Sequence, residues 1–177
     1  MEHFRHTQPC TCPTLGFTRQ ETMILTDITS SRLAYLDRTN IIIPQKYGSH
    51  KKPRVDYSWE QLLQLRAITH LKQTISLDLT RKIVHYFDEI GIAQNWGDRY
   101  LVIAGKDIFT CKSDWSDMPQ IMSDAAADRP EDFTVVVFPN IDRIVSDVCR
   151  VAIDSNLIDI ETFIERAKIG TPALLNG

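Results

Sequence analysis

The stretch from Ser30 to Pro44, SSRLAYLDRTNIIIP, limits what the chain can fold into more than any other segment. Leu33 and Leu36 are three residues apart in a mostly polar run, a spacing that places both on one side of a short helix. Three consecutive isoleucines follow and end at Pro44, which cannot donate a hydrogen bond to a neighbouring strand. The sequence therefore predicts a helix with little core of its own, followed by an extended segment at 41–43. Neighbouring elements must hold this helix, and its other face is left for binding.

Capping signals predict the helices around this stretch. A serine or threonine that can accept a hydrogen bond from the first free amides precedes each predicted start. These residues are Thr18, Thr29 or Ser30, Ser58 and Ser76. Gly91 ends the last of these helices, and the segment 45–57 carries turn signals at Gly48 and Pro53 that predict a projecting hairpin. The expected order in the first part of the chain is helix, turn, helix, hairpin, helix, helix.

The pattern changes after residue 97. Two strand-like runs, 99–104 and 107–112, are joined by a glycine and a lysine and predict a second hairpin. The acidic segment 113–132 is expected to be loop-like, with at most two helical turns. A buried strand at 133–139 and two amphipathic helices complete the prediction.

These elements predict an α+β fold in three parts. The parts are a flexible N-terminal tail at 1–15, a first unit at 16–91 and a small C-terminal α/β module at 98–177. Residues 16–97 carry 11 basic and 8 acidic side chains, whereas residues 98–177 carry 8 basic and 14 acidic ones. The formal net charge of −3 therefore combines a basic first part with an acidic second part. Such asymmetry indicates a basic surface that meets an acidic polymer.

Two short helices joined by a tight turn, the second poor in apolar residues, are typical of a helix-turn-helix whose second helix enters the major groove of double-stranded DNA. Arg32 suits the bidentate contact with guanine, while Ser30, Ser31 and Tyr35 suit phosphates. The hairpin, begun by the extended segment at 41–43, would be the wing. It offers four basic residues to phosphates and no acid among residues 44–54. These four are Lys46, Lys51, Lys52 and Arg54.

From Phe17 to Phe87 the order of elements and three motifs resemble the DNA-binding half of MerR-family transcriptional regulators. SRLAYLDRTNIIIP is similar to that family's second helix and its exit, RVDYSWEQLLQLRAI to its wing strand and third helix, and QTISLDLTRKI to its second helix-turn-helix. The resemblance implies a winged helix-turn-helix in a homodimeric repressor that binds a two-fold-symmetric operator in a promoter. It also implies a set of DNA contacts. These are Thr18, Arg19, Ser31, Arg32, Tyr35 and Arg54.

Three positions depart from the family pattern. Ala34 stands where the family has an arginine, Leu36 where it has a second tyrosine, and Asn40 where it has a glycine. Asparagine tolerates the left-handed backbone conformation that glycine supplies, so we expect the turn to form.

The larger departure lies behind the predicted DNA-binding unit. No heptad run follows Gly91, so residues 98–177 are expected to replace the family's long coiled coil as the dimerisation module. A regulator of this shape also resembles the MerR-type repressors encoded beside type V-K CRISPR-associated transposons. That likeness implies repression without a small-molecule inducer.

Two other hypotheses remain open from the sequence. One is an antitoxin-type autoregulator whose acidic C-terminal module binds a basic partner protein. The other is a winged module that binds protein instead of DNA. No enzyme is predicted, because the chain has no phosphate-binding glycine loop, HExxH or GxSxG motif, and no cofactor is expected.

Cysteines and histidines near the start of the chain allow one metal hypothesis. Their spacing matches no common structural zinc site, so a mobile tail is favoured. These residues are His3, His6, Cys10 and Cys12. Cys111 and Cys149 are expected to pack as small apolar groups. No apolar run of about 18 residues and no apolar leader are present, so we expect a cytoplasmic protein without membrane contact, associated with the nucleoid when bound to DNA.

Overall fold

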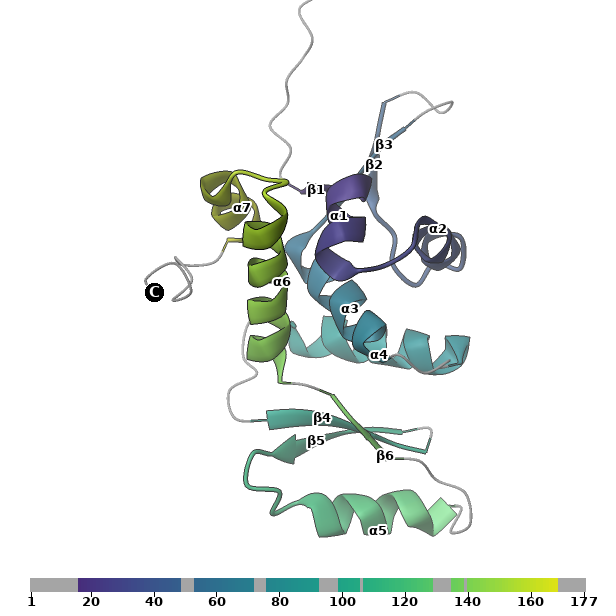
Figure 1. The fold of residues 1–177 in the computed structure, drawn as a ribbon. Coiled ribbons are helices and arrows are strands. Elements are labelled where there is room, and N and C mark those ends of the chain that lie inside the picture. Colours follow the sequence, from purple (N-terminus) through teal and green to yellow (C-terminus); the bar gives the residue numbers. More distant parts are fainter. Residues whose placement is uncertain are drawn as a thin grey trace, which may run out of the picture.

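In the computed structural model, the predicted α+β class is confirmed by a mixture of helices and two three-stranded antiparallel sheets (Figure 1). The structure describes residues 16–48, 53–71, 76–92, 99–105, 107–128, 135–138 and 140–168. The predicted tail at 1–15, with its four candidate zinc ligands, lies outside the described residues.

The first part of the chain follows the predicted order of elements. These are β1 (Phe17–Thr18), α1 (Arg19–Thr26), α2 (Ser30–Arg38), β2 (Gln45–Tyr47), β3 (Arg54–Tyr57), α3 (Trp59–His70) and α4 (Leu77–Ile90). The strands form one sheet in the order β1-β3-β2, with Phe17 opposite Tyr57 and Lys46 opposite Val55. The hairpin predicted for 45–57 is therefore confirmed in its two strands. Each predicted cap is also confirmed, with Thr29 as the residue that caps α2.

The extended segment predicted at 41–43 is wrong. Ile41 and Ile42 are buried in the turn after α2, and β2 begins only at Gln45. The backbone amides of Ile41 and Ile42 donate to the Leu36 carbonyl over 3.0 and 3.3 Å, so they close the end of the helix instead of forming a strand ladder. Their β-branched side chains add to the core beneath α2.

The second part holds the other sheet. Its elements are β4 (Arg99–Ala104), β5 (Asp107–Lys112), α5 (Met118–Asp128), β6 (Val135–Val137), α6 (Ile141–Ser155) and α7 (Ile160–Ala167). The predicted hairpin of β4 and β5 is confirmed, and β6 pairs with the other edge of β4. Leu101 and Ile103 join the main core, while Val102 packs with Cys111 and with Ile121 of α5. Both faces of the central strand β4 are therefore covered, with α5 on the side away from α6 (Figure 1). The strand predicted as buried at 133–139 is wrong in its burial, because β6 is an edge strand whose Val135 and Val136 are half-buried and whose Val137 is 40% exposed.

Helix α5 is longer than the sequence predicted. The segment expected to be loop-like contains an 11-residue helix. Met118 and Ile121 supply its apolar side, and the alanines at 125–127 favour helix more than any other residue. Pro119 lies in the first turn, where its missing amide would have had no helical partner.

The main core crosses the predicted division between 16–91 and 98–177. Helices α6 and α7 pack against the first part, and α6 lies alongside α1 and α3 (Figure 1). The Phe163 ring of α7 lies 5.8 Å from the rings of both Phe17 and Trp59. Trp59 is thus a packing residue, as predicted. Arg166 of α7 also lies 3.1 Å from the Glu21 carboxylate of α1.

Four ionisable residues lie at the contact between α3 and α6. His70 Nε2 lies 3.1 Å from a carboxylate oxygen of Asp147. Burial is the largest cause that lowers the pKa of His70, and Arg66 and Arg143 lower it further, while Asp147 opposes them. The net effect keeps the pKa of this imidazole below its ordinary value of 6.5.

This lowered pKa predicts a pH dependence of stability. The unfolded chain binds a proton at His70 more readily than the folded one, so the stabilising contribution is present above about pH 6.5 and is lost as the pH falls through the folded-state pKa. We expect His70→Gln to flatten the fall in unfolding free energy between about pH 6.5 and 5, measured by urea denaturation. His85→Gln is the matched control, because that side chain is 73% exposed. An unchanged slope in His70→Gln would contradict the prediction.

Candidate nucleic-acid interface

Helix α2 presents most of its surface to solvent. Of its nine residues only Leu33 and Leu36 are buried, as predicted. The three-residue turn before it begins at Asp27, whose backbone is left-handed with a φ of 56°. In Figure 1, α2 and the β2–β3 hairpin lie on the side of the molecule away from α6. The outer face of α2 is thus available to a large partner.

Side chains from both helices hold the start of α2. The Thr29 hydroxyl accepts a hydrogen bond from the Arg32 amide over 3.2 Å and lies 3.1 Å from the Ser31 hydroxyl. Arg19 donates to the Ser30 carbonyl over 2.7 Å and to its hydroxyl over 3.0 Å. Arg19, which the resemblance implied as a DNA contact, therefore ties the first turn of α1 to the first turn of α2.

Thr18 is also engaged within the fold. Its hydroxyl accepts from the Glu21 amide over 3.3 Å, and its own amide donates to the Glu21 carboxylate over 2.7 Å. Arg166 completes this group from α7, at 3.1 Å from the same carboxylate. Thr18 and Glu21 thus fix the start of α1, from which Arg19 reaches Ser30.

The last turn of α2 carries a second basic residue, Arg38, that the predicted site did not include. The Arg38 guanidinium lies 5.8 Å from the centre of the Tyr35 ring, a distance at which a cation is attracted to the ring face. Arg32 and Tyr35 are half-buried, whereas Arg38 is exposed. The three-residue spacing of Tyr35 and Arg38 was the available signal, because residues so spaced are neighbours on a helix.

Two of the predicted hairpin residues pair with carboxylates. Lys46 Nζ lies 2.7 Å from Asp37 of α2, so this ion pair joins the hairpin to the helix. Arg54 Nε lies 3.4 Å from Asp56, whose side chain is buried. Arg54 itself is exposed and stands opposite Tyr47 in the ladder. Lys51 and Lys52 lie outside the described residues.

Buried Tyr57 lies beneath this surface on β3. Its burial raises the pKa of the phenol, and Arg19 opposes that shift. The hydroxyl is therefore neutral at physiological pH.

The end of α2 is closed by a left-handed residue. Asn40 has a φ of 55°, and its amide donates to the Asp37 carbonyl over 3.0 Å. The next amide, of Ile41, donates to the Leu36 carbonyl over 3.0 Å. These two bonds form a Schellman motif, in which glycine is the usual residue. The expectation that asparagine serves in its place is confirmed.

The described ranges show neither a metal cluster nor a membrane span. Within them, no three histidine, cysteine or acidic side chains gather as a metal site. No helix there has both the length and the apolar character needed to cross a bilayer. Cys111 and Cys149 are free and buried, as predicted.

Comparison of the chain with models of protein families found no match, and comparison with curated proteins found none either. Function is therefore inferred from the residues and their arrangement.

The left-handed residue at the end of α2 generates a prediction about stability. Asn40→Val places a β-branched residue at a positive φ, which costs about 1–2 kcal/mol. Asn40→Gly removes the steric conflict and should stay within about 1 kcal/mol of the parent. Urea denaturation of the three proteins measures both differences. Equal stability of the valine and glycine variants would show that the turn does not constrain α2.

Proposed function

We propose that this protein is a sequence-specific double-stranded DNA-binding transcriptional regulator. In this proposal α1 and α2 are the helix-turn-helix of a MerR-type winged unit, α2 enters the major groove, and the β2–β3 hairpin is the wing. The observation that carries it is a nine-residue helix with two buried side chains, beside a hairpin, on the outer side of the molecule. A helix that contributes so little to the core is best explained by what its other face binds.

The residues of this face suit the parts of a DNA duplex. Arg32 is in the first turns of α2, where recognition helices contact base edges, and its guanidinium fits guanine O6 and N7. Ser30 and Ser31 are exposed at the helix N-terminus, which favours phosphate. Arg38 and Arg54 add exposed positive charge. Arg32 is thus proposed to read sequence, and the others to position the duplex.

Two residues of the predicted site have a different proposed role. Arg19 is proposed to fix the angle between α1 and α2 through Ser30, and Lys46 to fix the wing against α2 through Asp37. The Lys46 ammonium also offsets the Asp37 carboxylate, which would otherwise repel a phosphate. Both residues therefore support DNA binding through geometry and charge balance.

We further propose a homodimer that represses a promoter through a two-fold-symmetric operator. Two copies of α2 would then contact half-sites about 34 Å apart, one turn of the duplex. The acidic second part of the chain would supply the contacts between copies.

Substitution of Arg32 tests the base-reading role. A pool of random duplexes is first enriched with the parent protein, and the recovered site should contain two inverted half-sites. Arg32→Ala should then bind this site more weakly by about 2–6 kcal/mol, or about 30- to 25,000-fold, because the homodimer loses one contact in each half-site, and it should discriminate less at one base pair of each half-site. Fluorescence anisotropy measures both effects. Arg150→Ala is the control, because Arg150 is exposed on α6. Failure of the parent to enrich any sequence would refute the proposal.

Substitution of Arg54 tests the phosphate-binding role of the wing. Arg54→Ala should weaken binding to the enriched site and to unrelated duplexes by similar factors. It should also reduce the slope of log affinity against log salt by about 2, because the homodimer neutralises one fewer phosphate in each half-site. Anisotropy titrations at several salt concentrations give the slope. A sequence-dependent loss with an unchanged slope would assign Arg54 to base contact and contradict this role.

A further inference from the structure

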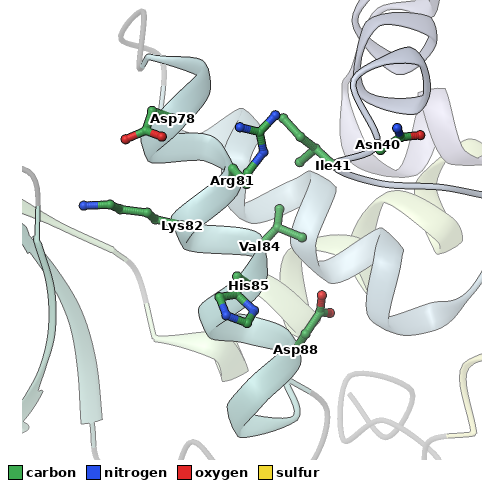
Figure 2. A pocket seen from close by; sticks show the side chains of 8 residues that line it. All are labelled: Asn40, Ile41, Asp78, Arg81, Lys82, Val84, His85 and Asp88. Atoms are coloured by element: carbon green, nitrogen blue, oxygen red, sulfur yellow. The ribbon is translucent and has the colours of Figure 1, made fainter.

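A pocket of about 360 Å³ lies between the turn that ends α2 and the outer side of α4. Asn40 and Ile41 line it from the turn, and α4 supplies the other side (Figure 2). The α4 residues are Asp78, Arg81, Lys82, Val84, His85 and Asp88. This volume is at the lower end of the range for small-molecule sites.

Arg81 is the cationic group of this pocket. Within the described ranges, no hydrogen bond or ion pair engages its guanidinium. Lys82 extends away from Asn40 and Ile41 (Figure 2), and its Nζ lies 3.7 Å from Asp107 of β5. The N–H groups of the Arg81 guanidinium are therefore available to donate hydrogen bonds to a bound anion.

Asp88 is the anionic group, and the fold holds it in place. Its carboxylate accepts a hydrogen bond from the Gln64 amide over 2.6 Å. Gln64 is on α3 and only 3% exposed, so its rotamer is fixed by packing. A carboxylate oriented by a buried donor is a prepared partner for an ammonium group.

Apolar surface lies between these charges. Ile41 and Val84 line the pocket and are 8% and 4% exposed. Arg81 and Asp88 are seven residues apart on one side of α4, which corresponds to a rise of about 10.5 Å. Asp78 precedes Arg81 by three residues, a spacing that makes the two neighbours on the helix, so its carboxylate disfavours a dianion such as phosphate at Arg81.

We propose that this pocket binds a small linear zwitterion, with its carboxylate on Arg81, its ammonium on Asp88 and its aliphatic chain on Ile41 and Val84. Molecules of basic amino-acid size, whose charges lie at opposite ends, have this chemistry. The resemblance to the MerR-type repressors encoded beside type V-K transposons implied repression without a small-molecule inducer. A zwitterion bound in this pocket would instead make the protein responsive to a small molecule.

Binding would act on the proposed DNA-reading helix, a step that rests on the proposed function. Asn40 and Ile41 belong to the Schellman motif that ends α2. A ligand that joins this turn to α4 selects one position of α2 relative to the rest of the unit. Affinity for DNA then changes with ligand concentration, and ligand affinity changes with DNA by the same factor.

The binding test uses five probes at equal millimolar concentration and ionic strength. L-lysine and 6-aminohexanoate carry both charges, whereas hexanoate, hexylamine and inorganic phosphate carry one kind. We expect the first two to raise the melting temperature of the full chain and to bind in calorimetry. Arg81→Met and Asp88→Asn should each weaken 6-aminohexanoate at least about tenfold, because each removes one charged partner. The amide oxygen introduced by Asp88→Asn can still accept from Gln64, and Arg150→Met serves as the control.

The outcomes separate the pocket from the proposed function. Equal effects of all five probes, or binding by hexanoate and phosphate alone, would overturn the zwitterion site. Unchanged affinity in both pocket variants would place the ligand elsewhere and overturn it too. Zwitterion binding by a protein that enriches no DNA would uphold the site and refute the regulator. If bound 6-aminohexanoate leaves the DNA affinity of the parent protein unchanged, the proposed coupling between ligand and DNA binding is refuted, while the ligand site itself is not.

Discussion

The placement of α2 is the constraint on which the rest of the structure depends. Two buried leucines cannot hold a nine-residue helix in water, since isolated helices of this length are marginal. Its position therefore comes from contacts at its ends. Thr29 and Arg19 hold the start, the left-handed Asn40 closes the end, and the Lys46–Asp37 pair joins it to the hairpin. None of these contacts uses the Arg32 guanidinium, which stays available for binding on the outer face.

The second part of the chain supports this placement from behind. Phe163 and Arg166 of α7 reach the aromatic cluster and the capping box at the start of α1. Glu21 therefore receives hydrogen bonds from its own helix start and from an element 145 residues further along. Arg166 of α7 is therefore linked through Glu21 to the start of α1, where Arg19 contacts the first turn of α2. The second part of the chain thus helps to fix the helix start from which Arg19 holds α2.

The sequence predicted features that local chemistry decides. Caps at Thr18, Ser58 and Ser76 and the left-handed Asn40 depend on residues within a few positions, and all are present. Prediction failed at 41–43, where three β-branched residues favour a strand but tertiary burial uses them to close a helix. The Arg166–Glu21 and Arg19–Ser30 contacts were not predictable, because no periodicity links residues so far apart.

The fold separates acidic and basic segments of the chain in space. The acidic helix α5 is at the opposite end of the molecule from the β2–β3 hairpin (Figure 1). A polyanion approaching at random experiences repulsion from that end and attraction toward α2 and the hairpin, within about 10 Å at moderate salt. The net charge of −3 does not therefore argue against the proposed DNA binding. Separation of charge along the molecule would orient such an encounter, and the contacts that hold α2 would set which side chains the duplex then meets.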